Sequence, residues 1–197
     1  MDLLSDFWLS VLASFIGGYA IAFIGVKWIP LLKLKKLGIL KVYKNQSHAI
    51  NSMLNDIGKS NMLYVLAMKG DSFSNPERPL SKFLCNTQIE QRYLISSIEN
   101  KHLQTRGDEL KINSIKQCVN VSITNFTIAQ ETNKNIQIKR HNELVRFRII
   151  LLRDYLYLSF QEKKNPGRES AILKISNKSP LYEGFCTSFE SLWDKYS

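Results

Sequence analysis

The chain has 197 residues, of which 44% are hydrophobic, enough to build the core of one ordinary domain, so the composition excludes a disordered chain. Lys and Arg outnumber Asp and Glu by 27 to 17, and the net charge of +10 favours an anionic partner such as nucleic acid, acidic lipid or an acidic protein surface. The three cysteines are widely spaced and form no CxxC pair. The cysteines therefore suggest neither a disulfide framework nor a zinc knuckle, and a reducing compartment fits best.

The first feature along the chain is an uncharged run, FWLSVLASFIGGYAIAFIGV, at residues 7–26. At about 1.5 Å per residue it matches the hydrocarbon thickness of a bilayer. We predict a transmembrane helix within residues 1–30, preceded by a short outer tail. A cleaved signal peptide is the alternative, because Ala20-Ile21-Ala22 has the form of a cleavage site, but no positive residue precedes the run.

The residues around this run predict its orientation and its association. Lysines follow the run and none precedes it, so the positive-inside rule makes this a single-pass protein with a cytoplasmic carboxyl-terminal domain. Small residues recur every four positions at Ser10, Ser14, Gly18 and Ala22. Such a ridge lets membrane helices approach closely, which predicts a homo-oligomer, although small residues are also common in any membrane helix.

Residues 31–45 mix leucines with lysines and predict a basic juxtamembrane linker, lying on anionic headgroups or simply solvated. Residues 46–197 then form a cytosolic sensor or interaction domain. Its apolar periodicity predicts helices at 48–57, 80–84 and 108–133 and after Pro180. Strands are predicted at 62–68, 92–98, 136–140, 144–152, 155–160 and 171–175. This interleaving indicates an α/β or α+β fold with a mixed sheet.

Catalytic and metal-binding motifs are absent from the sequence. It has no GxGxxG, GxxxxGK[ST], HExxH or GxSxG pattern, and His48, His102 and His141 are isolated from other metal-ligating residues. We predict neither a cofactor nor a metal.

The element order of the last 150 residues, roughly, resembles the phospholipase D-like fold, with strand MLYVLAMKGDSF, strands IQIKRHN and LVRFRIILLRDYLYLSF, and the closing helix LYEGFCTSFESLWDKY. Active members of that family carry His-x-Lys-x-x-x-x-Asp. With Asp154 placed on the aspartate of that motif, Phe147 and Ile149 occupy the histidine and lysine positions. Neither side chain can attack phosphorus or hold phosphate, so the resemblance implies a fold without catalysis.

A basic group of residues remains in the carboxyl-terminal third, and we predict that it binds an anionic partner. Its members are Lys139, Arg140, Arg146, Arg148 and Arg153. The alternative is a solvated sheet edge, where such charges discourage aggregation.

Three functions are consistent with these features. The first is a non-catalytic effector of the bacterial inner membrane, which resembles the toxic arm of an antiphage, abortive-infection system restrained or triggered by a partner such as a retron reverse transcriptase complex. The second is a membrane-tethered binding module for nucleic acid or a protein. The third is an enzyme, a phosphodiesterase or lipase, built from residues that no motif reveals.

Overall fold

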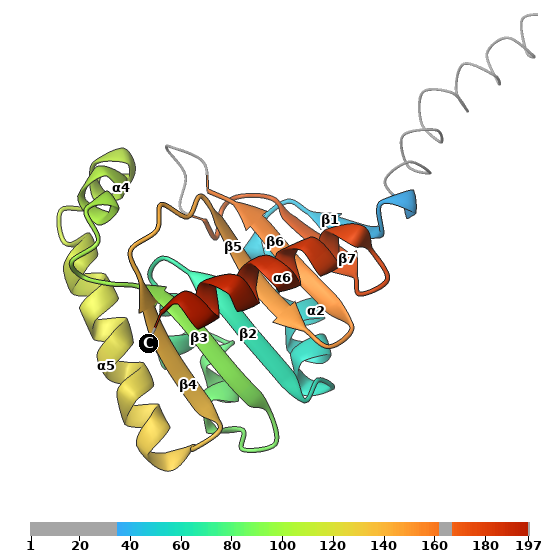
Figure 1. The fold of residues 1–197 in the computed structure, drawn as a ribbon, viewed down its shortest axis with the longest axis horizontal. Coiled ribbons are helices and arrows are strands. Elements are labelled where there is room, and N and C mark those ends of the chain that lie inside the picture. Colours follow the sequence, from blue (N-terminus) through green and yellow to red (C-terminus); the bar gives the residue numbers. More distant parts are fainter. Residues whose placement is uncertain (1–34, 162–166, 197) are drawn as a thin grey trace, which may run out of the picture. The chain divides into compact units, whose positions relative to one another are not determined.

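The computed structural model describes residues 35–161 and 167–196. The chain divides into two compact units, Met1–Leu37 and Gly38–Ser197. Nearly all the described residues belong to the second unit, which contains one sheet with helices on both faces (Figure 1).

The sheet has seven strands in the order β1-β7-β6-β5-β2-β3-β4. They are β1 (Ile39–Tyr43), β2 (Met62–Ala67), β3 (Glu90–Ser96), β4 (Ile136–His141), β5 (Phe147–Leu152), β6 (Tyr155–Phe160) and β7 (Ile172–Ser176). Strands β2, β3 and β4 are parallel to one another, whereas every other neighbouring pair is antiparallel. The fold is therefore a mixed α+β structure in which β5 lies at the centre of the sheet.

One face of the sheet is covered by α2 (Gln46–Gly58), α3 (Asp71–Ser74), the 3-10 helix η1 (Ser81–Cys85), α4 (His102–Leu110) and α5 (Ile115–Thr132). The other face carries α6 (Pro180–Lys195), which crosses in front of the strands in Figure 1. Because side chains alternate along a strand, each central strand contributes to both cores. On β5, Ile149 and Leu151 face α6, while Ile150 and Leu152 pack on the α2 side.

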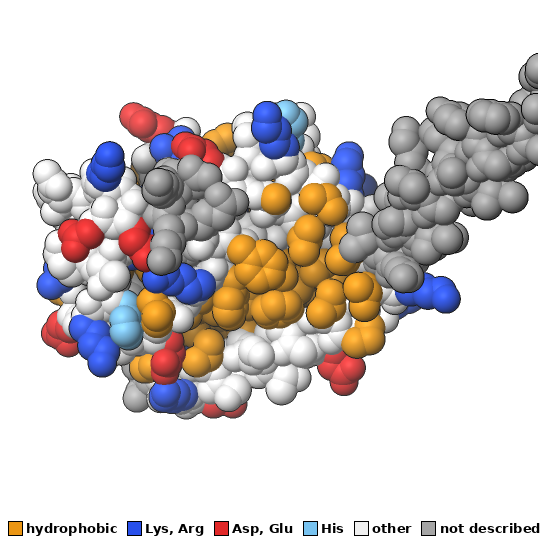
Figure 2. Space-filling model, turned by 90° about the horizontal axis from the view of Figure 1, so that it is seen from above, with side chains coloured by type: hydrophobic (Ala, Val, Ile, Leu, Met, Phe, Trp, Pro, Cys, Tyr) orange, Lys and Arg blue, Asp and Glu red, His pale blue; other side chains and the backbone are white. Residues whose placement is uncertain are grey.

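The face beneath α6 is only partly covered. Val42 and Phe160 are 53% and 54% exposed, and their cross-strand partners, Leu173 and Phe147, belong to the core beneath α6. Figure 2 shows hydrophobic side chains gathered in one area of the surface seen from above. The apolar end of the β5–β6 hairpin is thus a wall of this core that continues to the surface.

The structure corrects the predicted fold class and the predicted inner-membrane localisation. Among residues 35–161 and 167–196 there is no helix both long and apolar enough to cross a membrane. The longest described helix, α5, has 18 residues and interrupts its apolar stripe with exposed polar side chains, because it packs on a sheet. The predicted span, residues 7–26, and its small residues Ser10, Ser14, Gly18 and Ala22 lie outside the described residues.

Two local predictions also change. The helix predicted at 108–133 is two helices, because Lys111 adopts a left-handed backbone with φ of 55° and the N–H of Ile112 donates to Gly107 O at 2.8 Å. A glycine usually takes this left-handed conformation at the end of a helix. Here the residue is Lys111, so no glycine in the sequence marks the end of α4. Residues 39–43, predicted within a linker, form the edge strand β1, which pairs with β7.

A buried polar cluster fastens α2 to the sheet. The Tyr157 hydroxyl donates to Asp56 Oδ2 at 2.5 Å, and Lys174 forms an ion pair with the same oxygen. Burial, together with the hydrogen bond to Asp56, raises the pKa of Tyr157, so the phenol stays protonated and donates. The Ser52 hydroxyl completes the cluster at 2.7 Å from the Tyr157 hydroxyl. Each charged group therefore has a close partner, as buried charges require.

Asp56→Ala is expected to lower the free energy of unfolding by about 3 kcal/mol, because it leaves the nearly buried ammonium of Lys174 without its counter-ion. Urea unfolding of the full chain measures the change. Asp194→Ala, on the exposed side of α6, is the control and should change stability by less than about 0.5 kcal/mol. Equal losses in both variants would contradict the assigned role of Asp56.

Candidate functional site

A cavity of about 110 Å³ lies on the α2 side of the sheet, at the end of β2. Its apolar wall comes from β2, α3 and the α4–α5 junction: Val65, Ala67, Met68, Phe73, Ile112 and Ile115. Its charged side chains are Lys69, Asp71, Arg106, Arg148 and Arg168. We call this cavity the arginine pocket. Its charged lining comprises four cationic groups and one carboxylate, which makes it a site for an anion.

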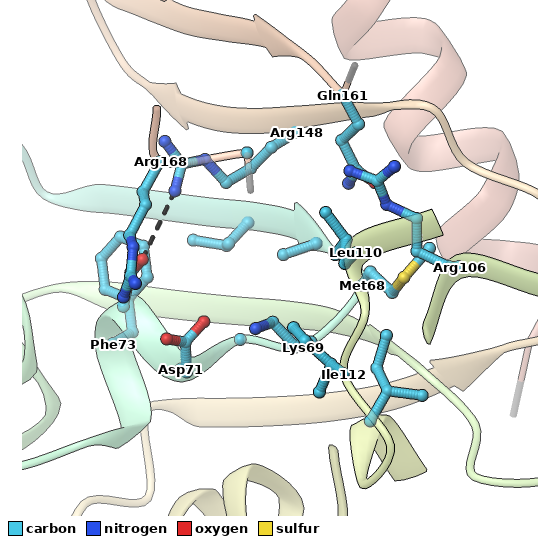
Figure 3. Close-up of a pocket in the computed structure, with 16 residues that line it drawn as sticks. Met68, Lys69, Asp71, Phe73, Arg106, Leu110, Ile112, Arg148, Gln161 and Arg168 are labelled. Carbon is cyan, nitrogen blue, oxygen red and sulfur yellow. Dashed lines mark hydrogen bonds between the residues drawn. The ribbon is translucent and has the colours of Figure 1, made fainter. Parts of the chain in front are cut away.

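Arg148 is one of two buried arginines that line the pocket, the other being Arg106. The Arg148 side chain extends from the centre of the sheet, and the residue is only 8% exposed. Nη1 donates to Gln46 Oε1 at 2.8 Å and lies 3.4 Å from Ser72 Oγ, a contact drawn in Figure 3. Nη2 is buried and has no hydrogen-bond partner among the described residues. Burial lowers the pKa of Arg148 to about 10, so the guanidinium remains charged at neutral pH with only neutral partners.

Strand alternation explains why an arginine is buried here. Arg148 pairs with Ser159 across the β5–β6 hairpin and lies on the same face as Ile150 and Leu152, which belong to the core on the α2 side. The strand therefore directs a charged side chain toward a covered face. Each such charge costs free energy unless an opposite charge compensates it.

A turn after β2 forms the adjacent wall of the pocket. Gly70 has a φ of 77°, and a Cβ atom there would approach Phe126 Cε2 to 2.8 Å, so only glycine fits. The turn places Asp71, Ser72 and Phe73 against the cavity. In Figure 3 the side chains of Arg148 and Arg168 extend toward the same part of the pocket, where Asp71 also lies.

Arg106 lies at the other end of the pocket and differs from Arg148 in having a counter-ion. Its Nη1 donates to Glu109 Oε2 at 2.8 Å, and Glu109 also accepts from Arg146 at 2.6 and 2.9 Å. The hydrogen bonds from Arg146 and Arg106 lower the pKa of Glu109 to about 2. Glu109 is thus a counter-ion shared by Arg106 and Arg146, and it ties α4 to the residue that precedes β5.

The residues predicted to bind an anionic partner do not form one surface. Arg148 lines the pocket, but Arg146 is engaged by Glu109, and Lys139 lies beneath α6, where its ammonium donates to Trp193 O at 2.8 Å. Arg153 and Arg140 are exposed, the first in the turn between β5 and β6 and the second on the edge strand β4. Only Arg148 of this group reaches the cavity.

The positions that align with the phospholipase D-like motif are structural. Phe147 contacts Phe185 of α6 edge to face, with ring centroids 5.6 Å apart, and Ile149 is fully buried in the same core. Both side chains face α6, on the opposite side of the sheet from the pocket. The hairpin accordingly supplies core side chains on one face and, on the other, Arg148, which lines the pocket.

A buried histidine lies at the end of β4. His141 is 1% exposed, and neither ring nitrogen makes a hydrogen bond of normal geometry with the described residues. Burial lowers its pKa to about 4, although the nearby backbone of Ala67 and the carboxylate of Glu143 favour the charged form. The Tyr196 ring contacts it edge to face, and the Tyr196 hydroxyl donates to Glu143 at 2.8 Å. Tyr196 thus packs against His141 at the end of β4, and the His141 imidazole is neutral.

Comparisons with known proteins give only a distant likeness of fold. No protein-family model and no curated protein matches the chain. The solved structure of TrmBL2, described as an archaeal chromatin protein with a novel mode of DNA binding, is similar over 100% of this chain and 68% of that chain. The identity is 10% and the TM-score 0.50, so the likeness concerns the fold alone. The phospholipase D-like resemblance and the antiphage association stay predictions, since no comparison tests them.

The buried His141 predicts an acid-sensitive stability. Its folded pKa of about 4 lies below the ordinary 6.5, so the unfolded chain binds the proton first and stability falls as the pH drops from 6.5 toward 4. Between pH 7 and 5 the wild type should lose about 2 kcal/mol more than His141→Leu in urea unfolding. Identical losses would show that His141 is not buried as a neutral ring.

Proposed function

We propose that the sheet domain is a non-catalytic binding domain that recognises an anionic group in the arginine pocket. One observation carries this proposal: the Arg148 guanidinium is buried and charged, and its Nη2 has no partner among the described residues. Buried polar groups in folded proteins are almost always hydrogen-bonded, and buried charges are paired. An exception at the wall of a cavity is expected where a ligand supplies the missing partner.

The contrast with Arg106 supports a ligand-binding role for Arg148. Both arginines are buried at the same pocket, yet Arg106 has Glu109 within 2.8 Å while Arg148 has only Gln46 and the more distant Ser72. The domain therefore provides a counter-ion where an arginine holds helix to strand. At Arg148 no such carboxylate forms an ion pair among the described residues.

The absence of catalysis in this proposal is supported by the hairpin. The two positions where phospholipase D-like enzymes carry their histidine and lysine hold Phe147 and Ile149, which pack beneath α6. Among residues 35–161 and 167–196, the pocket is lined by arginines, a lysine and one aspartate, but by no histidine, cysteine or paired carboxylates. Such a lining can hold an anion, and it offers no nucleophile matched to a base.

A small anion fits the domain better than a nucleic-acid strand. Of the basic residues that the sequence groups together, Arg146 and Lys139 are engaged inside the domain, so they form no continuous phosphate-binding stripe with Arg148. The DNA binding named for TrmBL2 does not carry over, because the likeness is one of fold at 10% identity. The defence role and a reverse transcriptase partner stay predictions that the described residues do not test.

Arg148→Met is expected to abolish anion binding without weakening the fold. Methionine has similar length and lacks the buried charge, so the free energy of unfolding should stay equal or rise by about 1 kcal/mol. Thermal unfolding of the full chain, at constant ionic strength in inorganic phosphate, sulfate or butyrate, measures both effects. At least one of these anions should raise the Tm of the wild type, and none should raise that of the variant.

Arg153→Met is the matched control, because it removes the same charge from an exposed turn. It should retain the wild-type response to every anion. A large loss of stability in Arg148→Met, with no anion effect on the wild type, would instead make Arg148 a structural residue and refute the proposed function.

A further inference from the structure

We infer that the ligand of the arginine pocket is a small monocarboxylate, meaning one carboxylate on a short apolar body. This inference rests on the proposed function and adds the chemical class of the ligand. It follows from the charge balance around Arg148, from the apolar wall of the pocket and from the size of the cavity.

The charge balance favours a single negative charge. Arg106 shares the Glu109 carboxylate with Arg146, whereas the buried Arg148 forms no ion pair with a carboxylate of the described residues. Asp71 lines the same part of the cavity and acts on Arg148 through its charge, without forming an ion pair with it. A phosphate ester brings about −1.5 to −2 charges at neutral pH and would add repulsion from Asp71. A carboxylate brings one charge, which the buried Arg148 guanidinium balances, while the other cations of the lining, the partly exposed Lys69 and the exposed Arg168, are screened by solvent.

The geometry of the arginine also suits a carboxylate. A guanidinium presents planar N–H groups that match the two oxygens of a carboxylate, and such pairs are shorter and stronger than neutral hydrogen bonds. Nη2 of Arg148 is free to donate, and the 3.4 Å contact from Nη1 to Ser72 is long enough for a ligand oxygen to replace it. The exposed Arg168, whose side chain extends toward the same part of the pocket in Figure 3, gives the entering anion a first contact.

The remainder of the cavity is apolar. Its wall is formed by Val65, Ala67, Met68, Phe73, Ile112 and Ile115, of which all but Ile112 are buried. This surface suits hydrocarbon, and each methylene placed against it should strengthen binding about fourfold. A bare inorganic anion would leave that wall without contacts.

The size of the cavity limits the apolar body. An apolar cavity of about 150 Å³ holds one benzene molecule. The arginine pocket, at about 110 Å³, therefore accommodates a ligand slightly smaller than a six-carbon ring. Acids of about three to five carbons meet this limit, whereas a mononucleotide does not.

The test is a titration of the full-length protein, by calorimetry at pH 7 and constant ionic strength, with acetate, propionate, butyrate, octanoate, inorganic phosphate and neutral butyramide. We expect the affinity to rise about fourfold per methylene from acetate to butyrate and to fall at octanoate, which exceeds the cavity. Butyramide should not bind, because it lacks the charge. Arg148→Met should weaken butyrate at least tenfold, and Arg153→Met should leave it unchanged.

Ile112→Trp tests the contribution of the apolar wall to binding independently of the contribution of the Arg148 charge. Ile112 is partly exposed at the α4–α5 junction, so a larger side chain there is expected to shorten the cavity without unfolding the domain. The variant should bind acetate as the wild type does and bind butyrate at least fivefold more weakly. Loss of both acids by equal factors would contradict an apolar subsite.

The outcomes distinguish this inference from the function on which it rests. If phosphate binds more tightly than butyrate, and Arg148→Met abolishes that binding, the ligand class is wrong while the anion-binding function stands. If no anion binds the wild type, or if Arg148→Met and wild type bind alike, both are refuted.

Discussion

Burial of the Arg148 guanidinium, which forms no ion pair with the described residues, is the feature on which the proposed function depends. The charge comes from β5, the central strand, and both faces of the sheet are covered, so the side chain lies between the sheet and the turn that follows β2. The fold tolerates this buried charge only because its other buried charges have partners of opposite charge. The Asp56–Tyr157–Lys174 cluster and the Glu109 pairs balance the other nearly buried charges on this side of the sheet.

The two faces of the β5–β6 hairpin have different roles, one in packing and the other in the proposed recognition of a ligand. Phe147, Ile149 and Leu151 face α6 and hold that helix on the sheet, whereas Arg148 faces the cavity. The hairpin carries the core side chains Phe147 and Ile149 at the positions that the predicted phospholipase D-like alignment assigns to histidine and lysine, and the arginine pocket lies on the opposite side of the sheet. The proposed binding function rests on this arrangement, because the described lining of the pocket supplies both charge and apolar surface.

Sequence periodicity was sufficient for most of the elements. Alternation and apolar runs predict β2 to β7 and the helices α2 and α6, because these segments carry one buried stripe or a fully buried run. It failed at Lys111, where a non-glycine residue takes a left-handed backbone, and at residues 39–43, where three consecutive exposed residues, Leu40, Lys41 and Val42, obscure the alternation of an edge strand. The fold class that joined a transmembrane helix to this sheet is the main correction, since the described helices are amphipathic and pack on strands.

The arginine pocket could not be predicted because its parts are distant in the sequence. It combines residues 65–73, residues 106–115, Arg148 and the neighbourhood of Arg168, which only the sheet order brings together. Grouping basic residues by proximity along the chain selected Arg148, but also Lys139 and Arg153, which the structure separates from it. One signal was present: the alternation of the hairpin places Arg148 on the face of Ile150 and Leu152, and a charge among core positions marks a functional candidate.

The most direct measurement is nuclear magnetic resonance of the arginine guanidinium groups in the ¹⁵N-labelled full-length protein, with Arg148 assigned by its absence in Arg148→Met. If Arg148 binds an anionic ligand, adding butyrate should shift its Nη resonances and slow the rotation of its guanidinium. The Nη resonances of Arg153 should stay unchanged. Unchanged Arg148 resonances at saturating butyrate and phosphate, or shifts confined to exposed arginines, would contradict a ligand-binding role for this buried charge.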